Sequence, residues 1–271
     1  MQSWRLIRNG PLSGALNMAV DEVLLNEVAQ ARSAPVLRLY RWQPAAVSLG
    51  YAQRGERQVN FEACRRHGID VVRRLTGGRA VLHQREMTYA VITRENVPPF
   101  SSSILDNYRL IADALLSAYT GLEVQCTLEP RRRRTEYVRE ASNVCFAAPS
   151  SYEIVRNGRK LTGSAQKRQG GAFLQHGSLP LEMDLDLLWE ILSPAEVDPE
   201  SKKKGRRVLE ESVDWINRLR SEPASELQVE EALIHSFADC LPIGLKEDCL
   251  REHEWARARN LASAKYAKNG G

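Results

Sequence analysis

The sequence predicts an α/β protein of the α+β-like kind, in which a mixed β-sheet is flanked by helices. Runs of alternating apolar and polar residues, which are typical of strands, dominate the middle of the chain. Apolar residues at helical spacing dominate its end, and strict alternation of strand and helix is missing. Together these observations favour a mixed sheet over a regular array of βαβ units.

Composition limits the class of protein. The chain has 271 residues, of which 43% are hydrophobic and 27% charged, as is typical of a globular protein with a substantial core. No internal repeat or clear linker divides it, so we expect one domain over residues 1–271, helical from about residue 201. No apolar run approaches membrane-spanning length, and residues 1–10 lack the core of a signal peptide, which favours the cytoplasm.

The expected elements follow from local signals. Ser13 is a good N-cap for a helix with apolar residues at positions 16, 19, 20, 23, 24 and 28. Gly68 is expected to end a short helix that begins at Asn60. Strands are predicted at residues 4–8, 36–42, 46–49, 69–73, 80–82 and 87–92. Further helices are predicted at residues 103–119, 185–192, 213–219, 229–241 and 249–265.

The segment Ser142–Leu181 contains most of the reactive side chains. Asn157-Gly158 separates two alternating runs, which predicts a β-hairpin with a type I′ turn. Lys160 is therefore expected on a strand just after this turn. Cys145 lies in a polar segment that contains Pro149, and such segments usually run over the surface and often carry function.

A thiol, an amine and glycine-rich backbone together have the chemistry of nucleophilic acyl transfer. Less specific interpretations stand beside this one. A lone cysteine is usually a small buried residue, which fits Cys64, Cys126, Cys240 and Cys249. The five cysteines form no CxxC pair and no zinc-like spacing with histidine, so free thiols, no metal and no cofactor are expected.

A second motif is Arg73–His83, where Gly77 and Gly78 separate two strand-like runs. A turn without side chains lets backbone amides line a narrow tunnel for an acyl chain. The alternative is a tight turn beside a packed histidine. We expect His83 and His176 to line a pocket or position backbone, and the remaining histidines to be structural or on the surface.

These stretches resemble the biotin/lipoate protein ligase superfamily. RRLTGGRAVLH is similar to its RRxxGGxAVxH signature, GRKLTGSAQKR is similar to GRKxxGSAxxR, and HGSL at residues 176–179 matches the strand that follows. The resemblance extends from the first helix to about Leu192. It implies the biotin/lipoate protein ligase catalytic-domain fold.

Cys145, followed by Lys160, looks like the cysteine-dependent octanoyltransferase branch of that superfamily. The resemblance implies an acyl-thioester on Cys145 and a thiol-activating role for Lys160, without a cofactor. It implies octanoyl-acyl carrier protein as donor, the glycine-cleavage H protein or a lipoyl domain as acceptor, and a monomer. The residues that it places around the acyl group are Arg74, Gly77, Gly78, His83, Gly163, Ser164, Ala165, His176 and Gly177.

Three alternatives remain from the sequence. On the same fold, an amidotransferase would take its acyl group from a modified protein, and a lipoate ligase would need ATP. Ligases often have GGGAVFHDxGN where this chain has GGRAVLHQREMTY. A basic nucleic-acid-binding module is the third, although the net charge is only +4. The basic runs Arg131–Arg134 and Ser201–Arg207 are expected to be solvated loops, and the more specific interpretation is that they dock an acidic protein.

Overall fold

The computed structural model describes residues 2–55, 58–130, 152–193 and 198–267. Its centre is a six-stranded sheet with the order β10-β11-β6-β2-β1-β12. The strands β1, β2 and β12 run parallel to one another, whereas β2, β6, β11 and β10 pair antiparallel. The bounds are β1 Gln2–Leu12, β2 Val36–Trp42, β6 Glu86–Arg94, β10 Gly163–Gln169, β11 Ala172–Pro180 and β12 Ile243–Asp248. The predicted α/β class with a mixed, helix-flanked sheet is confirmed.

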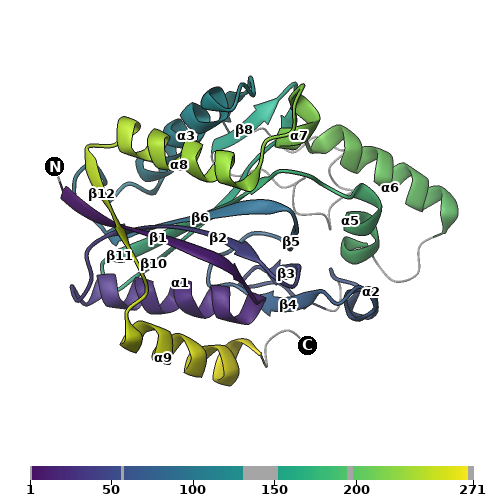
Figure 1. Ribbon diagram of the computed structural model, residues 1–271. Coiled ribbons are helices and arrows are strands. Elements are labelled where there is room, and N and C mark those ends of the chain that lie inside the picture. The colour runs from purple at the N-terminus through teal and green to yellow at the C-terminus, as the bar shows by residue number, and fades with distance from the viewer. Residues whose placement is uncertain (1, 56–57, 131–151, 194–197, 268–271) are drawn as a thin grey trace.

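Helices cover both faces of this sheet (Figure 1). On one face lie α3, Ile104–Gly121, and α8, Glu226–Cys240. On the other face lie α1, Gly14–Ala29, and α9, Glu252–Leu261. Side chains alternate along the strands, so that on β2 Leu37 packs toward the first pair of helices and Tyr40 toward the second. Two separate apolar cores result.

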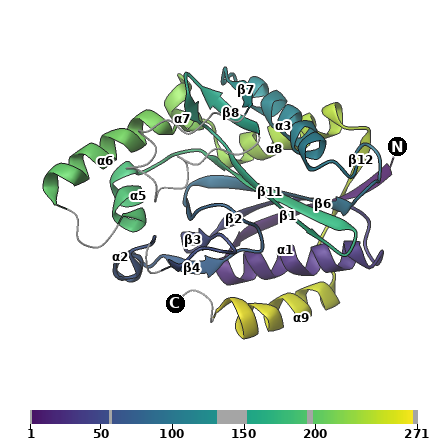
Figure 2. The same ribbon diagram turned by 180° about the vertical axis from the view of Figure 1, so that it is seen from behind.

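Two small sheets extend the main one. The first has the order β4-β3-β5, with β3 Ala46–Leu49, β4 Asp70–Arg73 and β5 Val81–His83. It packs with α2, Phe61–Arg66, and α5, Leu185–Leu192, in a third core, and the view from behind shows these elements together (Figure 2). The second sheet has the order β7-β8-β9, with β7 Thr127–Pro130, β8 Tyr152–Arg156 and β9 Arg159–Lys160.

Several local predictions are confirmed. The Ser13 side chain accepts a hydrogen bond from the Leu16 amide at the start of α1. Gly68 follows α2 with a φ of 62°, the left-handed conformation expected of a helix-ending glycine. Asn157 and Gly158 have φ values of 48° and 76°, as a type I′ turn requires. Lys160 therefore stands on β9 directly after the turn.

The basic run Ser201–Arg207 is not a loop, as the sequence predicted, but part of α6, Pro199–Ser212. Asp198 caps this helix by accepting from the amides of Glu200 and Ser201. A Cβ atom at Gly205 would lie 1.9 Å from the Trp189 ring, so this glycine lets α6 pack closely on α5. The second basic run, Arg131–Arg134, lies outside the described residues.

The C-terminal part is not wholly helical, which is a second correction. Ile243–Asp248 forms β12 and pairs with β1, where the sequence predicted only helices. The predicted helix at 213–219 shortens to α7, Ile216–Leu219, because Val213 pairs with Lys160 instead. Helix α9 continues into a π-helical turn at Ala262–Tyr266.

The residues Gly163, Ser164 and Ala165 begin β10. One smaller prediction also needs correction. Cys64 is buried and Cys126 half-buried, but Cys240 and Cys249 are exposed, so Cys240 and Cys249 are not small core residues.

In the described residues, no helix has both the length and the apolar character needed to cross a membrane.

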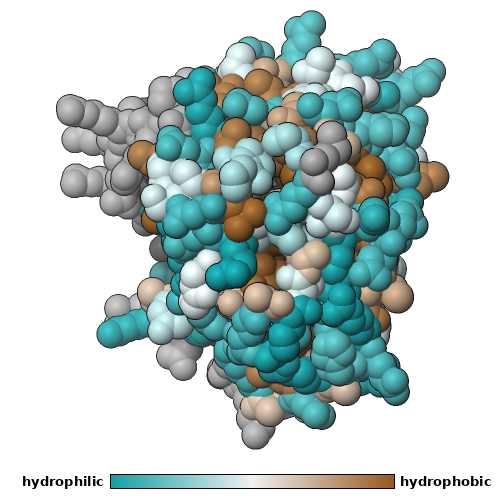
Figure 3. Space-filling model, turned by 90° about the vertical axis from the view of Figure 1, so that its left-hand side faces the viewer, coloured by the Kyte–Doolittle hydropathy of each residue, from teal (hydrophilic) through white to brown (hydrophobic). Residues whose placement is uncertain are grey.

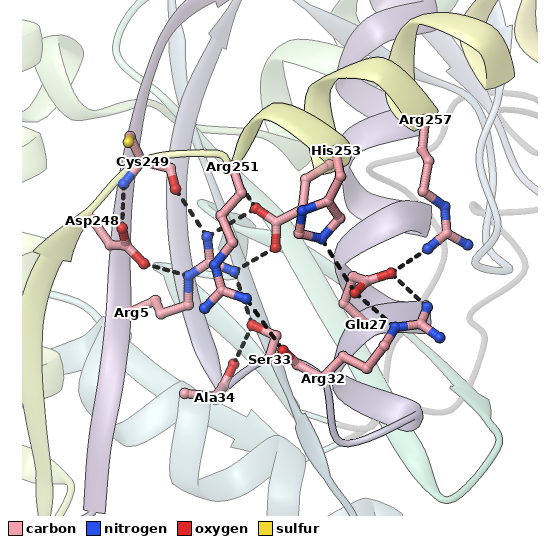
Figure 4. Close-up of polar contacts among 11 residues, drawn as sticks. Arg5, Glu27, Arg32, Ser33, Ala34, Asp248, Cys249, Arg251, His253 and Arg257 are labelled. Atoms are coloured by element: carbon pink, nitrogen blue, oxygen red, sulfur yellow. Dashed lines mark hydrogen bonds and ion pairs between the residues drawn. The ribbon is translucent and has the colours of Figure 1, made fainter.

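The C-terminal helix is attached through a cluster of charged side chains (Figure 4). Arg5 on β1 donates to Asp248 at 2.6 Å and to both carboxylate oxygens of Glu254 at 2.6 and 2.9 Å. Glu27 at the end of α1 pairs with Arg32 and Arg257.

Hydrophilic side chains predominate on the side of the molecule at the left of Figure 1, with hydrophobic ones interspersed (Figure 3).

Candidate active site

A cavity lies where the main sheet meets the small sheet β4-β3-β5. Its wall is built from α1, β2, β3, β5, β6 and β11, from the turn after β4, from the end of β9 and from the start of β10. The predicted site residues that line it are Arg74, Gly78, His83, Lys160, Gly163, Ser164, Ala165, His176 and Gly177. Gly77 is not in the lining, although its carbonyl takes part in the site. Cys145 lies outside the described residues.

Arg74 holds the glycine turn in place. Its side chain is buried and donates to the Ser48 carbonyl at 2.8 Å, the Gly77 carbonyl at 2.7 Å and the Arg79 carbonyl at 2.8 Å. A planar guanidinium with five donors can bind several carbonyls at once. These contacts show Arg74 supporting the glycine turn, and Arg74 also lines the cavity itself, so its predicted place beside the acyl group stays a prediction.

Glycines allow two close approaches in this wall. A Cβ atom at Gly50 would lie 2.0 Å from the Gly78 carbonyl oxygen, so the end of β3 touches the glycine turn directly. Gly78 itself has a φ of 94°. A Cβ atom at Gly177 would lie 2.6 Å from the Tyr89 ring and 2.7 Å from the Gly163 carbonyl. The backbone of β11 is thereby left open toward β10 and the cavity.

His83 belongs to a buried hydrogen-bonded chain. Its Nε2 lies 2.7 Å from Ser48 Oγ, and its Nδ1 lies 2.8 Å from Glu86 Oε1. Trp42 stacks on the imidazole with ring centroids 4.0 Å apart and 13° between the planes. The ring is therefore fixed in orientation, and its plane forms part of the cavity wall.

His176 belongs to a second chain on the other side of the cavity. Its Nδ1 lies 3.1 Å from Asp21 Oδ2 and its Nε2 lies 2.7 Å from Thr76 Oγ1. Asp21 also receives hydrogen bonds from Arg38 at 2.6 Å and Tyr40 at 3.0 Å. Burial lowers the pKa of His176, and Asp21 offsets this only in part, so the imidazole is neutral at pH 7.

The remaining wall is largely apolar. Met18, Tyr40, Trp42 and Val81 line the cavity between the two histidine chains. Met18 and Tyr40 are buried in the core between α1 and the sheet, whereas Gly78 at the opposite side is exposed. The cavity thus runs from a polar, glycine-rich rim to an apolar interior.

Lys160 lies at this rim and is almost completely buried. Its Nζ donates to Glu153 Oε1 on the neighbouring strand at 2.8 Å. Its carbonyl accepts from the Asp214 amide at 2.9 Å, so the backbone is held from both sides. With an exposure of only 6%, Lys160 is a buried residue and not a solvated strand lysine.

Sequence reasoning missed four side chains that organise the cavity: Ser48, Glu86, Asp21 and Glu153. Glu86 follows His83 by three residues, and that short spacing is a usable signal. Asp21 was detectable as a charged residue on the apolar face of the first helix. Ser48 and Glu153 carry no local signal, because only strand pairing brings them to His83 and Lys160.

The lining has the chemistry of an acyl-group site. An apolar interior can take a hydrocarbon chain, and the cationic side chain and glycine backbone at its rim can face a carbonyl. Within the described residues, no group of three or more histidine, cysteine, aspartate or glutamate side chains is placed to hold a metal ion.

The fold and this cavity define an enzyme that handles acyl groups. Residues 13–238 match the family model of the lipoyl protein ligase A/B catalytic domain, and the chain belongs to this family. The family resemblance predicted from the three motifs is thereby confirmed.

Several similar curated proteins carry the description "Octanoyltransferase LipM". The relative from Kyrpidia tusciae is 40% identical over 98% of this chain and 97% of its own length. The relative from Lysinibacillus sphaericus is 38% identical over 98% of this chain and 97% of its own. The relative from Bacillus subtilis is 37% identical over 99% of this chain and 97% of its own.

Solved structures share the fold. A bipartite lipoate protein ligase from Thermoplasma acidophilum has a TM-score of 0.78 at 24% identity, and the match covers 99% of this chain and 95% of that one. A lipoate-protein ligase A bound with ATP gives the same TM-score of 0.78, also at 24% identity, covering 99% of this chain and 97% of that one. At this identity the likeness concerns the fold alone.

Proposed function

We propose that the chain is an octanoyltransferase of lipoate biosynthesis that works by a ping-pong mechanism through a thioester on Cys145. The donor is octanoyl-acyl carrier protein, and the acceptor is a lysine of the glycine-cleavage H protein or of a lipoyl domain. The observation that carries this proposal is the near full-length similarity to octanoyltransferases, at 40% identity in one of them. The cavity supports it by combining an apolar interior with Lys160 at its rim.

In the first half-reaction, the Cys145 thiolate attacks the donor's thioester carbonyl. The carbon–sulfur bond to the carrier breaks, the phosphopantetheine thiol leaves, and an octanoyl thioester forms on Cys145. One thioester replaces another, so the step is close to isoenergetic and needs no ATP. The octyl chain enters the apolar interior, where burial of each methylene contributes about 0.8 kcal/mol.

In the second half-reaction, the neutral amine of the acceptor lysine attacks the Cys145 thioester. A carbon–nitrogen bond forms, the carbon–sulfur bond breaks, and the amine proton passes to the leaving thiolate. An amide is more stable than a thioester, and this makes the transfer favourable in the forward direction.

Lys160 contributes a positive charge next to the reacting carbonyl. Glu153, 2.8 Å from Nζ, orients the ammonium and limits its rotation. Both half-reactions pass through a tetrahedral oxyanion, and a fixed cation stabilises that charge more in a buried site than in water. Backbone amides of Gly163–Ala165 and of the turn at Gly77-Gly78 are the further candidate donors.

ATP-dependent ligation and nucleic-acid binding are less well supported. ATP-dependent ligation has no support from the relatives, which are described as octanoyltransferases. The net charge of +4 and the apolar cavity give no support to a nucleic-acid-binding module. We place the enzyme in the cytoplasm as a monomer, where Lys202–Lys204 on α6 and Arg131–Arg134 dock its acidic partners.

The test is a transfer assay with purified octanoyl-acyl carrier protein and apo H protein, without ATP. We expect the H protein to gain one octanoyl group, as measured by intact mass. A reaction that needs free octanoate and ATP would identify a ligase. A reaction that needs octanoyl-H protein as donor and a lipoyl domain as acceptor would identify an amidotransferase.

A further inference from the structure

Ser48, His83 and Glu86 form a chain of side chains that the proposed transfer does not use. Ser48 Oγ lies 2.7 Å from His83 Nε2, and His83 Nδ1 lies 2.8 Å from Glu86 Oε1. The three residues come from β3, β5 and β6. Ser48 and His83 both line the cavity that we assign to the acyl chain.

The surroundings determine where each proton lies. Burial opposes the charge of Glu86, but His83 and the hydroxyls of Ser178 and Thr88 outweigh it and lower the pKa of this carboxyl. Thr88 donates to Oε1 at 2.5 Å and Ser178 donates to Oε2. Glu86 is therefore an acceptor, so His83 Nδ1 carries the proton and Nε2 offers its lone pair to Ser48.

The Ser48 hydroxyl proton has one clear acceptor. Arg74 donates to Ser48 Oγ at 3.0 Å, which occupies one of the two lone pairs of this oxygen. The hydroxyl proton then points at His83 Nε2, and the second lone pair remains for attack on a carbon atom. Hydroxyl, imidazole and carboxylate thus follow one another in the order found in serine hydrolases.

We propose that Ser48 is a second acyl nucleophile, which makes the cavity a slow hydrolase of activated medium-chain esters and thioesters. Ser48 Oγ attacks the carbonyl carbon, and its proton moves to His83 Nε2. The bond to the leaving group breaks, and the leaving group takes that proton from His83. An octanoyl ester on Ser48 results, with no cofactor consumed.

Water completes the cycle. His83 Nε2 takes a proton from the water molecule as its oxygen attacks the ester, and then returns the proton to Ser48 Oγ. The products are octanoate and the original enzyme. The Arg74 guanidinium, 3.0 Å from Ser48 Oγ, stabilises negative charge that develops on this oxygen.

The same side chains limit the activity to molecules that enter the cavity. Ser48 has an exposure of only 1%, so an ester cannot reach it from the outer surface. The apolar neighbours Trp42 and Val81 favour a hydrocarbon acyl chain over a polar one. The substrate class rests on the proposed function, because it assumes that the cavity takes an acyl chain, but the nucleophile is independent of Cys145.

The experiment uses the full chain with Cys145→Ala, so that the proposed transfer nucleophile is absent. An octyl fluorophosphonate is added, and the modified residue is identified by peptide mass mapping. We expect the phosphonyl group on Ser48 and hydrolysis of 4-nitrophenyl octanoate at a measurable rate. Adding Ser48→Ala should remove the label and lower hydrolysis at least tenfold.

Two further variants sharpen the result. Ser236→Ala removes another buried serine, one that donates only to a backbone carbonyl of α8, and should leave labelling unchanged. Glu86→Gln should slow labelling at least a hundredfold at unchanged position, because the neutral carboxamide cannot stabilise an imidazolium and can present its N–H group to Nδ1, which favours the wrong tautomer of the imidazole.

The proposal is wrong if a protein with an unchanged thermal unfolding midpoint takes no label on Ser48, or if hydrolysis persists in Ser48→Ala. Its failure is distinct from failure of the transferase. If wild type forms an octanoyl adduct on Cys145 with octanoyl-acyl carrier protein but Cys145→Ala takes no label on Ser48, this inference alone is overturned. If Ser48 is labelled in Cys145→Ala but wild type forms no adduct on Cys145, the proposed function alone is overturned.

Discussion

Lys160 is buried at the rim of the cavity with Glu153 beside it. The gain in rate that it could give by activating the thiol alone is small. Lowering a thiol pKa from about 8.5 to about 7 raises the thiolate fraction at pH 7 roughly fifteenfold. A thiolate of lower pKa is also a weaker nucleophile, and this lowers the rate of attack roughly fivefold. The net gain in rate from thiol activation is therefore only about threefold. We expect Lys160 to increase the rate more by stabilising the oxyanion.

We therefore predict that Lys160→Met lowers the rate of octanoyl-enzyme formation at least a hundredfold, even at about pH 10, where the thiol is ionised. Single-turnover acylation measures this rate. Lys160→Arg should not restore it, because a planar fork does not replace a compact ammonium. Lys246→Met, on the far edge strand β12, is the matched control and should act as wild type. If high pH alone restored the acylation rate of Lys160→Met, the lysine would act only by lowering the pKa of the thiol.

The buried His176 links stability to pH. Its pKa is lowered from 6.5 by burial, so the unfolded chain binds a proton at a higher pH than the folded protein does. This contribution to stability is complete above about pH 6.5 and is lost as the pH falls toward the folded pKa. We expect the free energy of unfolding in urea to decrease from pH 7.5 to about pH 5.5, and His176→Gln to flatten this slope.

Exposed His235 provides the control for this measurement. His235→Gln should leave the slope unchanged, because its side chain is in solvent in both states. An identical slope in wild type and His176→Gln would show that His176 does not differ in protonation between the folded and unfolded chains.

At the scale of elements, β3 and the glycine turn shape the rim together. A side chain at residue 50 would collide with the Gly78 carbonyl at 2.0 Å, and backbone cannot yield as a flexible side chain does. Gly50→Ala should cost about 1–3 kcal/mol of unfolding free energy. It should also lower kcat/KM for the carrier substrate at least tenfold by displacing the turn.

Gly10→Ala is the matched control, because no atom lies within 4 Å of a Cβ there. It should retain both stability and kcat/KM. If Gly50→Ala has wild-type kcat/KM despite reduced stability, the position of the turn does not govern binding.

The attachment of α9 is a second prediction at this scale (Figure 4). Glu254 is completely buried and pairs with Arg5 at 2.6 Å. Removing one partner leaves the other charge buried, so Glu254→Gln should lower the free energy of unfolding by about 3 kcal/mol. Replacing both partners by methionine should recover part of this loss.

Glu252→Gln, an exposed substitution on the same helix, should change urea unfolding very little. A small effect of Glu254→Gln would mean that water or a rearranged Asp248 replaces the lost carboxylate beside Arg5.

Elements were predictable where the signal is local. The Ser13 cap, the Asn157-Gly158 turn and the periodic helices α1 and α3 depend on residues a few positions apart. Strand β12 was not predictable, because apolar and polar residues do not clearly alternate in Ile243–Asp248. This segment becomes a strand only by pairing with β1. The charges of the run Ser201–Arg207 predict a loop, because the packing of Gly205 on Trp189 arises only in the folded chain.

The same distinction holds for the site. The two glycine motifs and Lys160 were recognisable as sequence signatures, and the structure brings them into one cavity. The partners Asp21, Ser48 and Glu153 could not be assigned, because their roles arise from contacts between separate segments. His176 and Asp21 are 155 positions apart in the chain, and no local pattern links them.

At the scale of the whole molecule, the cavity lies beside two of the apolar cores: Met18, Tyr40 and Trp42 belong to the core beneath α1 and α9, and Val81 packs against the core of the small sheet. The main sheet carries β10 and β11 at one edge, the small sheet carries the glycine turn, and the β7-β8-β9 sheet carries Lys160. The proposed reaction requires Cys145, which lies outside the described residues, to meet this assembly at the rim beside Lys160.

The most direct test is to map the octanoyl group on the enzyme. Wild type is mixed with octanoyl-acyl carrier protein in the absence of an acceptor, and the peptides are analysed by mass spectrometry before and after hydroxylamine. We expect one hydroxylamine-labile octanoyl group on Cys145, which is absent from Cys145→Ala and is transferred when apo H protein is added. An octanoyl group on Cys64, Cys126, Cys240 or Cys249 instead, or transfer to the H protein by Cys145→Ala at the wild-type rate, would contradict it.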